Sequence, residues 1–142
     1  SGTRILLLHD QLGASPVSNL EKVRDFIAKW AARDVDGIIE AFSDDPFYHN
    51  IPLEPLTSKA AIRAFIEPFL EPATRVEWTV HFIAEDANGV VLTERTDAFE
   101  FGATRIALPV MGTFEFVDGK LSKWRDYFDL REFENQMAAL KN

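Results

Sequence analysis

Residues 90–101 read VVLTERTDAFEF, and this stretch decides the fold class. Asn88-Gly89 precedes it and Gly102-Ala103-Thr104 follows it, and both are turn sequences of the kind that join antiparallel strands. Side chains alternate between the two faces of a strand, so Val91 and Phe99 share one face. The stretch therefore predicts a long antiparallel strand whose apolar face packs on the core.

Three charged side chains fall on the apolar faces of predicted strands. Arg95 and Asp97 share the face of the apolar residues in 90–101. Asp126 shares a face with Trp124 and Phe128 in the predicted strand that follows Asp118-Gly119. An uncompensated buried charge costs several kcal/mol, so we expect the three groups to act together.

The rest of the chain is predicted to form helices first and strands afterwards. The predicted helices span residues 18–33 and 35–42, a third begins at Ser58 and is limited by Pro68 and Pro72, and a last one follows Asp129. The predicted strands are 75–82, 90–101, 105–117 and 120–128, with a short extended piece at 47–50 after the breaker 44–46. This order predicts an α+β domain. A strongly curved, mixed but mostly antiparallel sheet packs on N-terminal helices, and its concave face forms an apolar pocket.

Composition and charge limit the classes of function. The 142 residues suffice for about one domain, and the 46% hydrophobic content, with 12 Phe and 3 Trp, suits a core and an aromatic pocket. The net charge of −8 is spread along the chain and argues against binding to nucleic acid or an anionic membrane. The chain has no Cys, so we expect neither disulfides nor a thiolate nucleophile, and the cytoplasm is the simplest location.

One domain is predicted to fill most of the chain. We expect residues 1–17 to be a loosely held N-terminal extension and residues 18–142 to be the single domain. The aliphatic run Ile5-Leu6-Leu7-Leu8 is too short for a membrane span or for the core of a signal peptide.

A third segment adds two polar side chains to the predicted pocket. Tyr48 and Asn50 are two positions apart on the extended piece, so they share a face. Together with Arg95, Asp97 and Asp126 they suit a reaction that needs a general base, a general acid and a held water. An arginine can donate to two carboxylates at once and so fix both. A buried ion pair that holds strand register is the alternative, and the residues alone leave both interpretations open.

Three motifs resemble those of the limonene-1,2-epoxide hydrolase family. They are Tyr48-His49-Asn50-Ile51-Pro52-Leu53, Thr93-Glu94-Arg95-Thr96-Asp97, and Trp124-Arg125-Asp126-Tyr127-Phe128-Asp129-Leu130-Arg131-Glu132-Phe133-Glu134. The likeness runs from about the first helix to Glu134 in the same order and spacing. It implies a nuclear-transport-factor-2-like (NTF2-like, SnoaL-like) fold, a cystatin-like cone that is usually a homodimer. It also implies an enzyme that opens epoxides in one step without a covalent intermediate.

The resemblance also implies a role for each polar residue. Asp126 is expected to be the base that activates water, with Tyr48 and Asn50 holding that water. Asp97 is expected to be the acid that protonates the epoxide oxygen, and Arg95 positions both carboxylates. No metal or organic cofactor is expected, and the partners are a small lipophilic epoxide and water. Six residues are similar in position to the family's substrate-binding wall, although each also suits plain core packing: Phe99, Leu108, Val110, Trp124, Phe128 and Phe133.

Other functions remain as alternatives because the same fold hosts ketosteroid isomerases, polyketide cyclases and non-catalytic binding or scaffold domains. An isomerase gains nothing from an arginine that bridges two carboxylates. A binding domain has no reason to turn Tyr48 and Asn50 toward the same two aspartates. The three histidines, His9, His49 and His81, are predicted to be structural or solvated.

Overall fold

A computed structural model describes residues 17–141 of the chain. The helices are α2 (Asn19–Ala31), α3 (Val35–Ala41), α4 (Lys59–Leu70) and α5 (Leu130–Ala138), and α5 continues into the 3-10 helix η1 (Ala139–Lys141). The strands are β1 (Phe42–Asn50), β2 (Arg75–Glu85), β3 (Val91–Phe101), β4 (Thr104–Val117) and β5 (Lys120–Tyr127). The predicted extension, including His9, lies outside the described residues except for Val17. Within residues 17–141, no helix has both the length and the apolar character that crossing a membrane requires.

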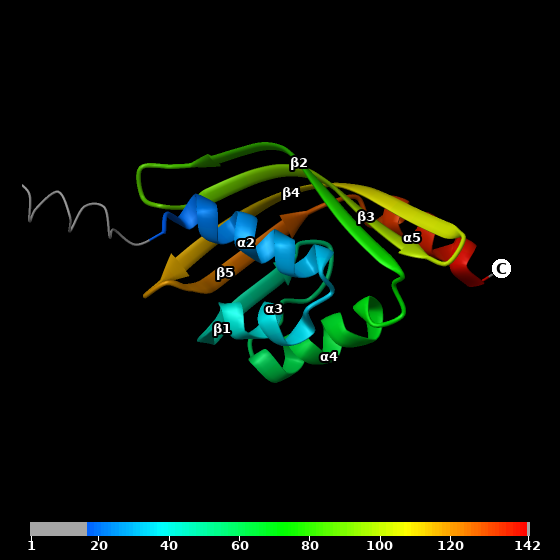
Figure 1. The fold of residues 1–142 in the computed structure, drawn as a ribbon, viewed down its shortest axis with the longest axis horizontal. Helices are drawn as coiled ribbons and strands as arrows, with labels where there is room; N and C mark the ends of the chain where they lie inside the picture. The colour runs from blue at the N-terminus through cyan, green and yellow to red at the C-terminus, as the bar shows by residue number, and fades with distance from the viewer. Residues whose placement is uncertain (1–16, 142) are drawn as a thin grey trace, which may run out of the picture.

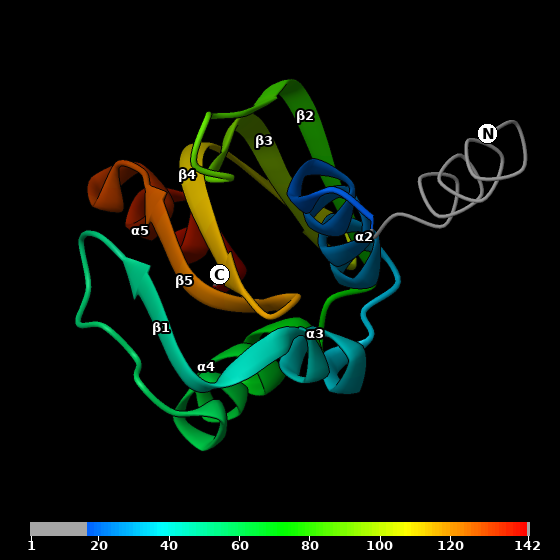
Figure 2. The same ribbon diagram turned by 90° about the vertical axis from the view of Figure 1, so that its left-hand side faces the viewer.

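The five strands form one mixed sheet in the order β1-β5-β4-β3-β2. β1 runs parallel to β5, and every other neighbouring pair is antiparallel. Figure 1 and Figure 2 show the sheet as an open, curved wall with β1 and β2 at its edges and the N-terminal helices on its inner side. The predicted fold class, a curved and mostly antiparallel sheet packed on helices, is therefore confirmed.

Helix α2 supplies much of the core because its apolar residues recur at helical spacing. Ser18 caps the helix by accepting a hydrogen bond from the Glu21 backbone N–H at 3.2 Å. The four buried residues of the helix are Val23, Phe26, Ile27 and Trp30. Phe26 meets Trp124 of the sheet edge to face, with ring centroids 5.0 Å apart. This contact fixes α2 against the concave face.

Strand β1 starts earlier than the sequence predicts. Residues 44–46 were expected to break the chain, but the strand runs from Phe42 to Asn50 through Pro46. Its register with β5 shifts between Phe42 and Phe47, where the strand bulges. The reason is the place of β1 in the sheet. β1 is an edge strand: β5 is its one neighbouring strand in the sheet, and on the other side it has an isolated bridge between Tyr48 and Leu56. An edge tolerates a proline that cannot donate to a ladder.

Glycine-containing turns join the consecutive strands β2, β3, β4 and β5, as predicted. Gly89 and Gly102 have φ values of 83° and 65°, in the left-handed region that glycine adopts without a steric penalty. Asp118 and Gly119 both have positive φ, 50° and 78°, which is the requirement of a tight turn matched to strand twist. The meander of four long antiparallel strands follows from these turns.

Helix α5 covers part of the edge of β4 that β5 leaves unpaired. Asp129 caps the helix, as predicted, by accepting from the Glu132 backbone N–H at 3.0 Å. The pairing of β5 with β4 begins only at Met111, so β4 has a free edge before that residue. There Gln136 accepts from the Ala107 N–H at 2.8 Å and donates to the Ala107 carbonyl at 2.9 Å. One amide side chain thus satisfies both backbone groups and holds α5 on the sheet.

The Gln136 amide should contribute measurably to stability. Gln136→Ala leaves two backbone groups of Ala107 without their partners, so the free energy of unfolding should fall by about 1–2 kcal/mol in urea titrations. The exposed neighbour Asn135→Ala is the control and should stay within about 0.5 kcal/mol of wild type. Equal stabilities for the two variants would contradict this role for Gln136.

Candidate active site

A cavity of about 270 Å³ lies between the concave face of the sheet and helices α2, α4 and α5. Most of its wall is aromatic or aliphatic. The polar groups at the wall include the carboxylates of Asp97 on β3 and Asp126 on β5, and the side chains of Tyr48 and Asn50 on β1. The cavity thus offers an apolar compartment with a cluster of hydrogen-bonding groups.

The structure brings together the five polar residues predicted from the sequence. Asp97, Asp126, Tyr48 and Asn50 line the cavity and are all buried, and Arg95 lies between the two carboxylates. Of the six predicted wall residues, five line the cavity: Phe99, Leu108, Val110, Phe128 and Phe133. The sixth, Trp124, is fully buried in the core and donates its indole N–H to Asp126 Oδ1 at 2.8 Å.

Arg95 is the centre of the polar cluster, and its side chain has no exposed surface. Its Nε and Nη2 donate to Asp97 Oδ1 and Oδ2 at 3.0 and 2.8 Å. Its Nη2 and Nη1 donate to Asp126 Oδ2 and Oδ1 at 2.9 and 3.3 Å. Nη1 also donates to Thr93 Oγ1 at 2.8 Å. A guanidinium has five N–H donors, so this geometry uses all of them and leaves the side chain one orientation.

Burial and neighbouring charges shift the pKa values of Asp97, Arg95 and Tyr48. Burial raises the pKa of Asp97 to about 6, against the opposing effect of the positive charge and hydrogen bonds of Arg95. Burial acts to lower the pKa of Arg95, but the two carboxylates outweigh it and raise that pKa above its ordinary value. Burial, reinforced by the charge of Asp126, raises the pKa of Tyr48, so its phenol is protonated at neutral pH.

The parallel pairing of β1 with β5 places the phenol and the amide in the cluster. Tyr48 is the register partner of Trp124, and Asn50 is the register partner of Asp126. The Tyr48 ring stacks on Trp124 with centroids 4.4 Å apart and planes inclined by 13°. A shift of one residue would turn both polar side chains away from the cavity, so the register of this edge strand is a requirement of the site.

Residues 17–139 match the sequence profile of the limonene-1,2-epoxide hydrolase catalytic domain. The chain belongs to this family. A curated relative, epoxide hydrolase EphG of Mycobacterium tuberculosis, is 32% identical over 108 residues, which cover 76% of this chain and 71% of that protein. The solved structure of a limonene-1,2-epoxide hydrolase-like epoxide hydrolase from M. tuberculosis is 29% identical and has a TM-score of 0.72. That match covers 85% of this chain and 90% of the other.

More distant structures share the fold of this epoxide hydrolase family member. A SnoaL-like protein from Shewanella denitrificans, described among polyketide cyclases, has a TM-score of 0.73 at 14% identity. The match covers 85% of this chain and 97% of that one, and at this identity it supports the architecture alone. The predicted family, the NTF2-like and SnoaL-like fold and the enzyme class, epoxide hydrolase, are thus confirmed.

Sequence reasoning missed three residues that support the cluster in this family member. Thr93 accepts from Arg95, and its own hydroxyl points to the Gly112 carbonyl at 3.4 Å. Gly112 is paired with Thr93 on one side and with Asp126 on the other. Trp78 lies 4.9 Å from the guanidinium carbon and stacks a ring face against the charge. Two signals were available: Thr93 lies on the same strand face as Arg95, and a glycine inside a strand marks a close approach.

Other wall residues could not be identified from the sequence. Helix α4 contributes Phe65, Ile66 and Phe69 to the cavity, and the loop after β1 contributes Leu53. The period of an amphipathic helix says which side is apolar but not which apolar residue meets a cavity and which meets the core. Only the tertiary arrangement distinguishes the two.

The histidines within the described residues lie apart from the cluster, as predicted. His49 is hydrogen-bonded through Nε2 to the Leu53 carbonyl at 2.9 Å, and the exposed His81 to Thr96 Oγ1 at 2.8 Å. Within residues 17–141, no three His, Cys, Asp or Glu side chains are grouped as a metal site requires.

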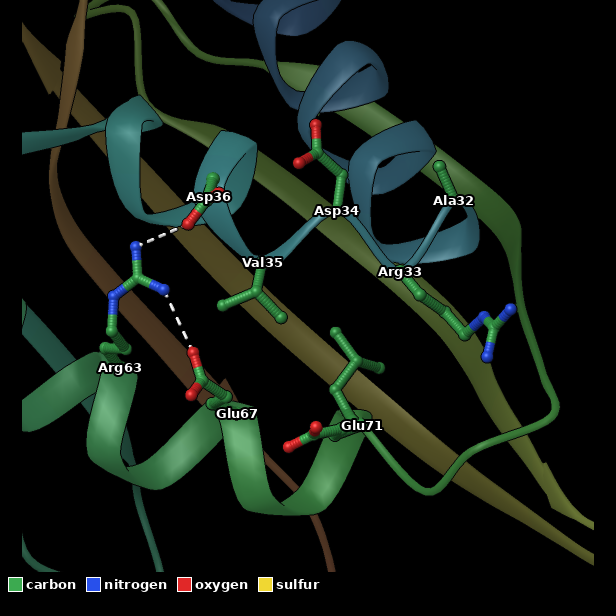
Figure 3. Close-up of a pocket in the computed structure, with 9 residues that line it drawn as sticks. Ala32, Arg33, Asp34, Val35, Asp36, Arg63, Glu67 and Glu71 are labelled. Carbon is green, nitrogen blue, oxygen red and sulfur yellow. Dashed lines mark hydrogen bonds and ion pairs between the residues drawn. The ribbon is translucent and has the colours of Figure 1, made fainter.

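A second hollow, of about 550 Å³, opens where α3 and α4 meet the end of α2. Figure 3 shows Arg63 of α4 lying between two carboxylates there. Arg63 donates to Asp36 at 2.8 Å and to Glu67 at 3.0 Å. These are largely exposed ion pairs on the surface, where such pairs contribute little, and the polar cluster of the first cavity is the candidate active site.

Gly112 should tolerate no side chain. A Cβ at this position would overlap Asp126 Oδ1 and lie 2.8 Å from Arg95 Nη1, both of which are held by several hydrogen bonds. Gly112→Ala should therefore lower the free energy of unfolding in urea by about 1–3 kcal/mol. The control is Ala84→Val, which adds carbon atoms at an exposed position of β2. Wild-type stability of Gly112→Ala would contradict the steric argument.

Proposed function

We propose that this protein adds water to a lipophilic epoxide in one step and releases a vicinal diol. The observation that carries the proposal is a buried Arg95 that donates to Asp97 and Asp126 where both carboxylates line an apolar cavity. The apolar wall favours a hydrocarbon-rich substrate, and the carboxylates supply an acid and a base at fixed positions. Family membership supports the same reaction class.

In this mechanism Asp126 is the general base. It takes a proton from a water that the Tyr48 hydroxyl and the Asn50 amide hold, and the water oxygen attacks one ring carbon of the epoxide. The bond from that carbon to the ring oxygen breaks. Asp97, the general acid, gives its proton to this oxygen, and the raised pKa of Asp97 suits the role because it increases the protonated fraction near neutral pH.

Arg95 positions both carboxylates and keeps their charges from repelling freely. After the reaction Asp126 holds a proton and Asp97 has lost one, so a proton returns from Asp126 to Asp97 before the next turnover. The chemistry needs no covalent intermediate, since water attacks the ring directly. The absence of a cofactor, the homodimer and the cytoplasmic location all stay predictions.

An isomerase-type reaction fits the cluster less well. A proton abstraction next to a carbonyl needs one base facing an oxyanion hole, and the oxyanion hole must keep free donors for the substrate oxygen. Here every N–H of Arg95 is already used by Thr93, Asp97 and Asp126. The arrangement therefore favours a paired acid and base over an oxyanion hole.

Removal of either carboxylate should abolish most of the activity. Asp97→Asn and Asp126→Asn should each lower kcat for limonene oxide or cyclohexene oxide by at least about 100-fold, the usual scale of a lost acid or base. Asp25→Asn, at an exposed position of α2, is the control.

In single turnovers with heavy-oxygen water the label should enter the diol directly. Label recovered in an aspartate, or wild-type rates in both variants, would overturn the mechanism.

The pH dependence should reveal Asp97. The acid must be protonated to act, so kcat/KM should decrease about tenfold per pH unit once the pH exceeds the Asp97 pKa of about 6. A profile measured from pH 4 to 9 checks this, and Asp97→Glu should keep an alkaline limb with a shifted midpoint. Activity that stays constant from pH 6 to 9 would contradict an acid role for Asp97.

A further inference from the structure

The two carboxylates of the candidate active site receive different numbers of hydrogen bonds. Arg95 gives two N–H bonds to Asp97 and two to Asp126, so it divides its donors evenly. Asp126 accepts one more, from the indole Nε1 of Trp124 at 2.8 Å. No corresponding donor reaches Asp97 from the residues that the structure describes. The bond from the indole N–H is thus the main difference between the hydrogen bonds that the two carboxylates accept.

The indole N–H is fixed in its direction by the packing of its ring. Tyr48 stacks on one side with centroids 4.4 Å apart, and Phe114 stacks at 5.4 Å. Phe26 meets the same ring edge to face at 5.0 Å. Trp124 has no exposed surface, so it has no space in which to rotate its N–H away from Asp126.

A donor that cannot accept favours the ionised form of its partner. The indole nitrogen only donates, and a hydrogen bond to a charged carboxylate is stronger than one to a neutral acid. At a site this buried the difference is large because water does not replace the lost bond. When the cluster holds one proton, the indole therefore makes Asp126 the less favourable place for it.

We propose that Trp124 is a positioning residue that keeps the negative charge on Asp126 and the shared proton on Asp97, and so sets which aspartate is the base and which is the acid. The inference rests on the proposed function and explains how two similar carboxylates acquire opposite roles. Trp124 acts through Asp126 and lies behind the cavity wall, so it needs no contact with the substrate.

The other groups that face Asp126 do not supply this asymmetry. Arg95 serves both carboxylates, Asp97 is the second carboxylate, and Glu134 of α5 lies at the exposed part of the cavity wall. The phenol of Tyr48 and the amide of Asn50 face the pair from β1 and are both assigned to the water. Helices α2 and α4 present only apolar or indole groups to the cavity, so the Trp124 N–H remains the distinguishing donor.

The first test removes the N–H and keeps an aromatic ring at this position. Trp124→Phe, measured with limonene oxide, should lower kcat about tenfold and leave KM within about twofold, since the substrate wall is unchanged. The acid limb of the pH profile of kcat should move up by about one unit, because an Asp126 without its donor is easier to protonate. A packing role alone would not move this limb.

Two further variants separate the hydrogen bond from the packing. Trp124 replaced by β-(3-benzothienyl)alanine keeps the shape of the ring with sulfur in place of N–H, and it should reproduce the shift of the acid limb. Trp30→Phe makes the same exchange in a tryptophan of the same aromatic cluster whose indole N–H has no partner among the described residues. This control should leave the acid limb in place.

A readout independent of activity locates the proton. In isotope-edited infrared spectra at pH 5, the band of the protonated carboxyl should vanish in Asp97→Asn and persist in Asp126→Asn. In the benzothienyl variant the proton should be shared between both aspartates.

An unmoved acid limb together with an unchanged band would overturn the inference while the wild type still hydrates epoxides. Failure of the wild type to hydrate any epoxide would instead overturn the proposed function, and the infrared comparison would still decide the role of Trp124.

Discussion

The buried guanidinium of Arg95 is the interaction on which the rest of the structure depends. A cation with no exposed surface is stable only if all its donors are used, and Asp97, Asp126 and Thr93 use all five. These partners come from two strands, so the sheet must keep them in one register. Gly112 of β4 leaves the room that the network needs between those strands.

The curvature of the sheet leaves room for a cavity beside this network. Helices α2, α4 and α5 pack against the concave face and leave a hollow over the polar cluster. The apolar wall excludes most water from the carboxylates, and the raised pKa of Asp97 is a direct result. The same burial that stabilises the fold through apolar contacts thus raises the pKa of Asp97 toward neutral pH, as its proposed role as an acid requires.

Alternation along β3 and β5 was enough to predict Arg95, Asp97 and Asp126 as inward groups, because a period of two leaves each residue only one face. The turn sequences were equally informative. The start of β1 was predicted wrongly, since the tolerance of Pro46 depends on being at a sheet edge, which local sequence does not report. The α4 wall was missed because its role exists only after the elements have packed, whereas Thr93 shares a strand face with Arg95 and could have been found from alternation. The catalytic roles themselves stay predictions.

The parallel pairing of β1 with β5 has a consequence for how the chain reaches its native state. Asn50 and Asp126 are neighbours in the sheet but are separated by more than half of the chain, whereas β2 to β5 join through short local turns. Closing a long loop costs entropy that contacts repay only after they form, so non-local pairings tend to be slow steps in folding. The meander can thus assemble before β1 docks, and Tyr48 and Asn50 would be among the last groups to arrive. A nearly folded chain would then already hold its ion network and still lack the side chains assigned to the water.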